Sequence, residues 1–351
     1  MEDSAKILQP ASFKNLRFAA VKRIPSLDGL RAVSILLVIL GHWVTKHHQL
    51  TFLAVYANVG VRVFFVISGY LITTLLLSEQ QKTGGISLRA FYIRRAFRIL
   101  PAAFVFIIPV ILLRWDEMRW YDVAAAMLYL VNFDFACPWF VGYLWSLSVE
   151  EQFYLLWPAL LQKCFRHRVR VLVAVMTVAP IYSALCHRLK LPGGGYGTFP
   201  AVADNLAVGC LLAVFAPHIR KIGGSLAWVM VFGIVLIPHF PANTPLRTLF
   251  MLFVLWPLMH LSIAGLVLHV VQNPYAILNL GPVVFLGKIS YSLYLWQQLF
   301  FYRPESFPIY VALPLSLGFA CLSYFLVEQP MLKLRDTRLR EARLSLATAG
   351  D

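Results

Sequence analysis

Charged residues are scarce in this sequence. Asp, Glu, Lys and Arg together make up 13% of the 351 residues, whereas they make up about 25% of a typical soluble domain. The chain also lacks any polar stretch long enough to fold separately, because apolar runs of 18 or more residues recur along it. These two absences exclude a soluble globular protein. With 60% hydrophobic residues, the composition predicts an all-α, polytopic integral membrane protein.

Cysteine is rare too, with five residues scattered along the chain. Their spacing resembles neither a disulfide framework nor a metal site, so we expect no metal and no bound cofactor. Acidic residues are outnumbered, 16 against 31 basic ones, which gives a net charge of +15. In a membrane protein such an excess is more typical of basic cytoplasmic loops than of nucleic-acid binding, and we expect no nucleic-acid partner.

Ten segments are predicted to cross the membrane and to contact its lipids. They are residues 28–46, 57–78, 95–114, 139–162, 169–187, 199–216, 225–239, 246–271, 281–302 and 307–328. If the N-terminus is inside, 21 of the 31 Lys and Arg lie in inner segments, which places both termini in the cytoplasm. Acidic residues and Pro138 interrupt residues 115–138, which we expect to form an outer amphipathic or re-entrant segment.

The chain therefore divides into three predicted parts. Residues 1–24 form a cytoplasmic N-terminal segment, residues 25–331 the transmembrane domain, and residues 332–351 a basic cytoplasmic tail. The first 24 residues are mostly polar and show no cleavage site, so we expect the first span to remain in the mature protein.

The first span carries three ionisable residues, Asp28, Arg31 and His42. Arg31 and His42 are eleven residues apart, which is close to three helical turns, so they share a face about 16 Å apart. If Arg31 lies at the inner edge of a ~30 Å hydrocarbon core, His42 lies near its middle. An ionisable group at that depth is a functional candidate, although a histidine that only packs helices together is the alternative.

The fourth span carries the adjacent carboxylates Glu150 and Glu151 near its middle, at the predicted depth of His42. A carboxylate beside a histidine can hold its tautomer and stabilise the imidazolium, which suits general-base catalysis on a hydroxyl. The alternative is an ion pair with Arg31 or Arg62 that only neutralises charge.

Two other spans contain polar groups that lipid would exclude. The second carries Ser68 and Tyr70 around a glycine, which offers close backbone approach and two hydroxyls but is also a common helix-packing device. The ninth carries Lys288 and Tyr291 and is too polar for a helix that faces lipid. Together these residues outline a polar interior.

The third span begins with Arg95 and Arg98, which share one helical face at the predicted cytoplasmic boundary. Arginines in this position either anchor the helix by the positive-inside rule or bind a phosphorylated cytoplasmic ligand.

These motifs, in this order, resemble the acyltransferase-3 family of integral membrane O-acyltransferases. The resemblance rests on residues 27–32 with His42, then 64–70, 92–98, 144–154, 287–296 and 328–330. It implies ten transmembrane helices in a bacterial inner membrane and transfer of an acyl group, commonly acetyl from cytoplasmic acetyl-CoA. The acceptor it implies is a hydroxyl of a cell-surface or lipid-linked carbohydrate.

The resemblance also implies roles for individual residues. His42 corresponds to the essential histidine of the family and Arg31 to its partner arginine. Arg95 and Arg98 correspond to the arginine pair at the donor entrance. In the acidic motif, Glu150 is preferred over Glu151 because it opens the pair.

The chain departs from the family in two places. Many members have Trp-His in the ninth-span motif, where this chain has Trp296-Gln297. The chain also ends soon after the tenth predicted span, without the SGNH hydrolase-like domain that is fused to some members. We therefore expect any second transfer step to need a separate protein, or the membrane domain to complete the reaction alone.

The mechanism expected from these residues is direct transfer. The nucleotide end of acetyl-CoA would bind Arg95 and Arg98, and His42, oriented by Glu150, would take the proton from the acceptor hydroxyl. A covalent acyl-enzyme on Ser68 or Tyr70 is an open alternative, for which the sequence offers no hydrogen-bonding argument. The alternatives from other classes are a transporter or flippase for a lipid-linked sugar and a non-catalytic scaffold.

Overall fold

The computed structural model describes residues 24–45, 48–133, 136–191, 197–241, 243–301 and 307–348. All regular structure in these ranges is helical, which confirms the all-α prediction. The predicted N-terminal segment lies outside the described residues except for Ile24, and the last three residues of the predicted tail lie outside them as well.

Seven helical runs are long and apolar enough to cross a membrane. They are α1 (Pro25–Val44), α2 (Val55–Thr83), α3 (Leu88–Leu113), α7 (Arg168–Arg188), α8 (Phe199–Phe215), α10 (Pro245–Phe250) continued through a π-helix into α11 (Trp256–Gln272), and α14 (Ile309–Ser323) continued through a π-helix into α15 (Gln329–Thr348). The chain is thus an integral membrane protein by the length and composition of its helices.

The other three predicted spans are helical but do not meet that standard. Helix α6 (Trp145–Lys163) is too polar, and α9 (Gly224–Leu236) is too short. The ninth predicted span is broken at Ile289 into α12 (Gly281–Lys288) and α13 (Ser290–Phe301). A total of ten spans and the cytoplasmic location of both termini therefore stay predictions.

The segment before α6 consists of short helices. Its longest helix is α4 (Trp120–Met127), followed by the single turn α5 (Trp139–Gly142). Neither can cross a membrane, so the described part of residues 115–138 contains no span, as predicted. The fourth predicted span begins later than expected, because α5 ends in a turn at Tyr143 and Leu144 before α6 starts at Trp145.

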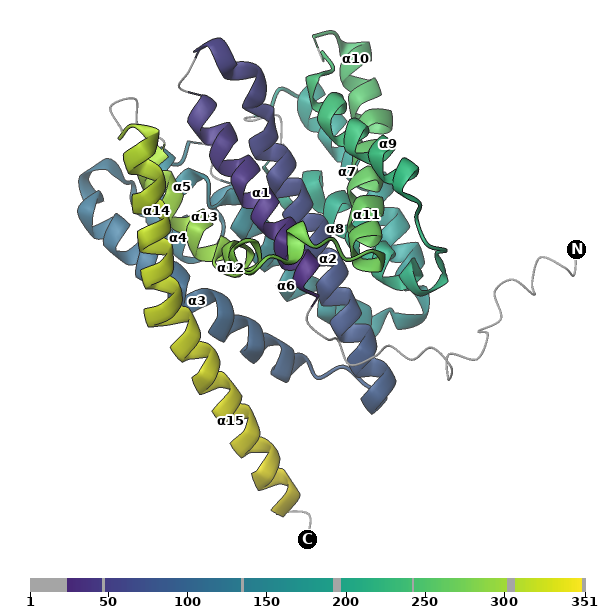
Figure 1. Ribbon diagram of the computed structural model, residues 1–351, viewed down its shortest axis with the longest axis vertical. Helices are drawn as coiled ribbons and strands as arrows, with labels where there is room; N and C mark the ends of the chain where they lie inside the picture. Colours follow the sequence, from purple (N-terminus) through teal and green to yellow (C-terminus); the bar gives the residue numbers. More distant parts are fainter. Residues whose placement is uncertain are drawn as a thin grey trace, which may run out of the picture.

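Helices α1 and α2 lie in the middle of the molecule (Figure 1), with α7–α11 on one side and α3, α4, α13 and α14 on the other. Helix α8 packs closely on α2 through Gly69 and Gly209. A Cβ atom at Gly69 would lie 2.2 Å from the Leu206 carbonyl oxygen, and one at Gly209 2.2 Å from that of Val66. Larger residues would separate the two backbones, so both glycines set this contact.

Close glycine contacts of α1 with α2 and with α12, which leads into α13, fix which residues lie at the same depth. Gly60 of α2 packs against Ser34 of α1, and Gly287 packs against the backbone of Asp28. Helices α1 and α2 are antiparallel, whereas α13 runs in the same direction as α1 (Figure 1). Residues late in α1 therefore lie beside residues late in α13, and residues late in α2 lie beside the start of α1.

Candidate active site

Three hollows meet at Arg31 and Arg98, which line all three. We call them the basic vestibule, of about 620 Å³, the inner cavity, of about 80 Å³, and the side hollow, of about 370 Å³. Arg95 lines the first two. The arginines predicted to meet the donor thus lie where a large outer space narrows into a small inner one.

The basic vestibule is strongly cationic. Its charged lining residues are Arg31, Glu79, Lys82, Arg94, Arg95, Arg98 and Arg335. They come from α1, α2, α3 and α15, and only one of them is acidic. Clustered guanidinium groups of this kind bind phosphates through bidentate hydrogen bonds, so the vestibule suits a ligand with several phosphates.

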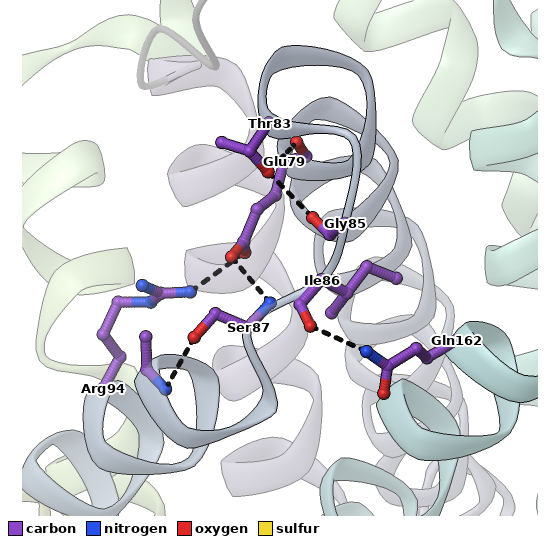
Figure 2. Close-up of polar contacts among 8 residues, drawn as sticks. Glu79, Thr83, Gly85, Ile86, Ser87, Arg94 and Gln162 are labelled. Carbon is purple, nitrogen blue, oxygen red and sulfur yellow. Dashed lines mark hydrogen bonds and ion pairs between the residues drawn. The ribbon is translucent and has the colours of Figure 1, made fainter.

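The turn between α2 and α3 forms the rim of the vestibule (Figure 2). Glu79 accepts hydrogen bonds from the backbone N–H of Ser87 at 3.0 Å and from Arg94 at 3.2 Å. The Ser87 hydroxyl caps α3 by accepting from the Ala90 N–H, and Gln162 of α6 donates to the Ile86 carbonyl at 3.0 Å. These bonds hold the start of α3, and with it the arginines, against α2 and α6.

Arg95 and Arg98 differ from Arg94 because they have no anionic partner. In the part of the chain that the structure describes, neither guanidinium forms a hydrogen bond or an ion pair with a protein group. Arg95 stacks instead over the Tyr154 ring at 5.0 Å, and both arginines lie within electrostatic range of Arg31. Partly buried charges in proteins normally have partners, so this unpaired pair is suited to an anionic ligand.

The inner cavity contains a chain of hydroxyl and carboxyl groups. Tyr154 donates to the Ser68 hydroxyl at 3.2 Å, and Ser68 donates to the Glu150 carboxylate at 2.7 Å. Glu150 also lies within electrostatic range of Arg31 and Arg95. Helices α2 and α6 thus place a serine, a tyrosine and a carboxylate along the path beyond the arginines.

The predicted candidates Glu151 and Tyr291 also line the inner cavity, and Tyr291 donates to the Ile99 carbonyl at 3.0 Å. The far end of the cavity is formed by Ser146 and Tyr294, whose hydroxyls lie 2.6 Å apart. Tyr294 also donates to the Tyr143 carbonyl at 2.9 Å. The end of the cavity is therefore held by hydrogen bonds between α13 and the start of α6.

Asp28 and Lys288 line the side hollow rather than the inner cavity. Asp28 forms a long ion pair with Arg31, 3.9 Å between the charged atoms. Glu328, at the end of the second π-helix, lines the same hollow and accepts a short hydrogen bond from Ser292. Asp28, Lys288 and Glu328 thus share with Arg31 a hollow that is distinct from the vestibule.

His42 does not meet Glu150, in contrast to the prediction. Ser68, the partner of Glu150, lies eight residues beyond Gly60, or about 12 Å toward the start of α1. His42 lies eight residues from Ser34, the partner of Gly60, in the opposite direction. Instead of a carboxylate, the His42 ring meets Gln297 of α13, with 3.1 Å between Nδ1 and Oε1.

Tyr70, predicted to contact the donor, and Arg62, weighed as an alternative ion-pair partner of Glu150, lie away from these hollows. Tyr70 does not line the three hollows; it is 6% exposed and packs in an apolar cluster against α8 and α11. The reason is helical periodicity: Tyr70 follows Ser68 by two positions, and two positions on a helix turn a side chain by about 200°. Arg62 is not a partner of Glu150: it donates to His260 at 2.7 Å and to Asn205 at 3.3 Å, on the other side of α2.

Sequence reasoning missed several lining residues. Tyr154 follows Glu150 by one helical turn and could have been found from the i, i+4 spacing. Arg335 and Gln297 could not, since only the packing of α15 and α13 brings them to the site. Among the described residues, no group of three His, Cys, Asp or Glu is placed to hold a metal ion.

Comparisons with known proteins find similarity to acyltransferases. A family model for an acyltransferase domain, acyltransferase 3, matches residues 24–327. Peptidoglycan O-acetyltransferase OatA of Listeria monocytogenes is 30% identical over 313 residues, covering 79% of this chain and 49% of that protein. O-acetyltransferase OatA of Staphylococcus aureus is 30% identical over 375 residues, covering 92% of this chain and 59% of that protein.

The chain spans between about half and three fifths of the length of these relatives. No solved structure matches it. Because the family model covers nearly all the described helices, the chain belongs to the acyltransferase-3 family.

Proposed function

We propose that this protein is a membrane O-acyltransferase that moves an acyl group, most simply acetyl, from cytoplasmic acyl-CoA to a hydroxyl of a carbohydrate. The observation that carries the proposal is the unpaired pair Arg95 and Arg98 at the junction of the basic vestibule and the inner cavity. An acyltransferase that uses CoA needs this combination of a phosphate site outside and a narrow path inside.

The vestibule supplies the phosphate site. The nucleotide end of CoA carries several phosphate charges, and guanidinium forks pair with phosphate oxygens through two parallel hydrogen bonds. Arg95 and Arg98 bind these groups most closely, while Lys82, Arg94 and Arg335 add positive charge at the rim. At about 620 Å³ the vestibule offers room that the inner cavity, at about 80 Å³, lacks.

The inner cavity guides the acyl-bearing arm. Ser68, Ser146 and Tyr294 provide hydroxyls along its wall, which suit the amide groups of that arm. Glu150 offsets the charge of Arg31 and Arg95 when no ligand is present. The cavity ends at Tyr294, three residues or about 4.5 Å along α13 before Gln297, the partner of His42.

His42 serves as the general base at the far end of this path. It takes the proton of the acceptor hydroxyl as that oxygen attacks the thioester carbonyl carbon. The carbon–sulfur bond then breaks, and the leaving thiolate takes the proton back from the imidazolium. Donor and acceptor thus approach His42 from opposite ends, and Glu150 acts on the donor side rather than as the partner of His42.

The relatives support the choice of acceptor. One of them is named a peptidoglycan O-acetyltransferase, which favours a carbohydrate hydroxyl as the acceptor. We place the protein in a bacterial inner membrane with ten spans and both termini in the cytoplasm, so that the basic vestibule faces the acyl-CoA pool. Family membership favours this reaction over the transporter or flippase alternative.

The test is acetyl transfer in sealed vesicles that contain wild-type protein or the His42→Ala variant. Labelled acetyl-CoA is added on the side of the membrane that the vestibule faces, and peptidoglycan fragments serve as the acceptor. The release of CoA and the labelling of the fragments are measured. Wild type should do both, and His42→Ala should lower the rate by about 10²- to 10⁴-fold, the usual contribution of a general base. A folded His42→Ala variant as active as wild type would contradict the proposal.

A further inference from the structure

The side chain that contacts His42 is a neutral amide, Gln297, at the position where many family members have a histidine. Gln297 is completely buried and Gln298 is 2% exposed. Burial of two adjacent amides inside a membrane protein is costly unless their hydrogen bonds are satisfied.

The Gln297 amide has one orientation that satisfies its neighbours. Its Nε2 group, which only donates, faces the Tyr294 carbonyl at 3.5 Å and the Gln298 Oε1 at 3.4 Å. Its Oε1 atom, which only accepts, faces His42 Nδ1 at 3.1 Å. Turning the amide over would set an N–H donor against His42 and an oxygen against the Tyr294 carbonyl oxygen.

This orientation decides the tautomer of His42. Because Oε1 can only accept, Nδ1 must carry the proton, and the lone pair of the neutral ring then lies on Nε2. No described residue forms a hydrogen bond with Nε2, and no charged side chain acts on the ring electrostatically. The nitrogen left to take a proton is thus the one that no described residue occupies.

The turn of α13 that carries Gln297 is also held in place. Tyr143 donates to the Leu295 carbonyl at 2.6 Å, while Tyr294 donates to the Tyr143 carbonyl and pairs with Ser146. These bonds join α13 to the start of α6 just below Gln297. The backbone that carries the Gln297 amide is therefore held in place, so the amide can orient the imidazole.

We infer that Gln297 is a positioning residue for this reaction: it holds the proton of His42 on Nδ1 so that Nε2 faces the acceptor hydroxyl. The inference rests on the proposed function. A neutral acceptor fixes the tautomer without adding negative charge near the middle of the membrane, where a carboxylate would be costly to bury. In this chain, Gln297 thus does for His42 what Glu150 was predicted to do.

The test compares three variants in the vesicle assay with acetyl-CoA and peptidoglycan fragments. Gln297→Met keeps the volume and removes the acceptor, and Gln297→Glu keeps an acceptor oxygen. Gln272→Met is the matched control, because this glutamine at the end of α11 bonds the Ile222 backbone and takes no part in holding His42. We expect Gln297→Met to lower kcat by about 10- to 100-fold, the usual effect of losing a group that orients a reactive ligand, with the KM for acetyl-CoA unchanged. Gln297→Glu should recover part of the rate, and Gln272→Met should match wild type.

Thermal unfolding in detergent confirms that each variant is folded, and if Gln297→Met does not fold, the comparison of Gln297→Glu with wild type decides. The inference is overturned if Gln297→Met is as active as Gln272→Met, or if Gln297→Glu is inactive although it is folded. A failure of the proposed function looks different, because wild type would then be no more active than His42→Ala.

Discussion

Helix α2 separates two clusters of buried charge that are organised in opposite ways. On one side, Arg62 donates to His260 and Asn205 and stacks over the Trp256 ring at 4.0 Å. His260 in turn lies 3.3 Å from the Asp204 carboxylate, between Nδ1 and Oδ2. The hollow beside this cluster measures only about 20 Å³, which leaves room for little more than a water molecule.

On the other side, Arg95 and Arg98 have no hydrogen-bonded or ionic partner among the described residues, and they face a vestibule of about 620 Å³. Three guanidinium groups lie within electrostatic range of one another there, with Glu150 to offset them. In the first cluster, protein groups satisfy the buried charges. In the second, the two arginines are placed to bind an anionic ligand.

The two histidines repeat this contrast. His260 uses both ring nitrogens, one toward Arg62 and one toward Asp204, and is 1% exposed. His42 uses only Nδ1 in its contact with Gln297. Ionisable residues inside a membrane protein are candidates for function by default. The buried ionisable residues thus form two groups: those whose hydrogen-bonding atoms are all bonded to protein groups, such as His260, and those with an atom left for a ligand, such as His42.

The largest expected effect tests the completed cluster. Asp204→Asn removes the negative charge that offsets Arg62 and should lower the free energy of unfolding by about 3–5 kcal/mol, the cost of breaking a buried ion pair. Denaturant unfolding in detergent measures this loss, with Asp336→Asn on the exposed side of α15 as a control. Because the cluster lines a hollow separate from the vestibule, the folded fraction should keep the wild-type affinity for CoA. A stable Asp204→Asn variant that loses CoA binding would reverse the assignment of the two clusters.

A smaller effect is expected in the open cluster. Glu150→Gln keeps an acceptor for Ser68 but removes the charge that offsets Arg31 and Arg95, so stability should fall by about 1–3 kcal/mol. The same change strengthens the attraction for phosphate, and the Kd for CoA should fall by up to about tenfold, or 1.4 kcal/mol. CoA should therefore raise the melting temperature of this variant more than that of wild type. An unchanged or weaker affinity would show that Glu150 does not compete with the ligand for the arginines.

Much of this arrangement could be predicted from the sequence, where helical periodicity alone decides. Arg95 and Arg98 share a face because three residues make nearly one turn, and the structure places both on the vestibule. Arg31 lies at the junction of the hollows, and Glu150, Glu151, Ser68 and Tyr291 line the inner cavity. These groups could be identified from the sequence because lipid excludes polar and ionisable side chains, which therefore face the interior of the protein.

The relative depth of Glu150 and His42 could not be predicted. The prediction assumed a helix that starts at the membrane surface at Trp139, but α6 starts at Trp145, six residues or about 9 Å later. By then the chain has already turned inward through α5, and Trp145 packs against Phe65 of α2. The short helices of this segment, which hydropathy does not resolve, move Glu150 toward the arginines.

Gln297 was beyond sequence reasoning for a different reason. The bend at Ile289 gives α13 its own direction, and only that direction brings Gln297 to His42. In the sequence motif, glutamine in place of histidine indicates the loss of a functional group. In the structure, the same glutamine places a hydrogen-bond acceptor 3.1 Å from His42 Nδ1.

The central claim is that the unpaired arginines form the donor site. Isothermal titration of CoA into the detergent-solubilised protein tests it most directly, with Arg95→Ala, Arg98→Ala and, as a matched control, Arg89→Ala at the exposed start of α3. Hydrogen bonds to charged groups are worth about 1.5–3 kcal/mol, so each of the first two variants should weaken CoA binding by roughly 10- to 150-fold. Arg89→Ala should bind like wild type. If Arg95→Ala and Arg98→Ala bind CoA as tightly as Arg89→Ala does, the vestibule is not the donor site and the account fails.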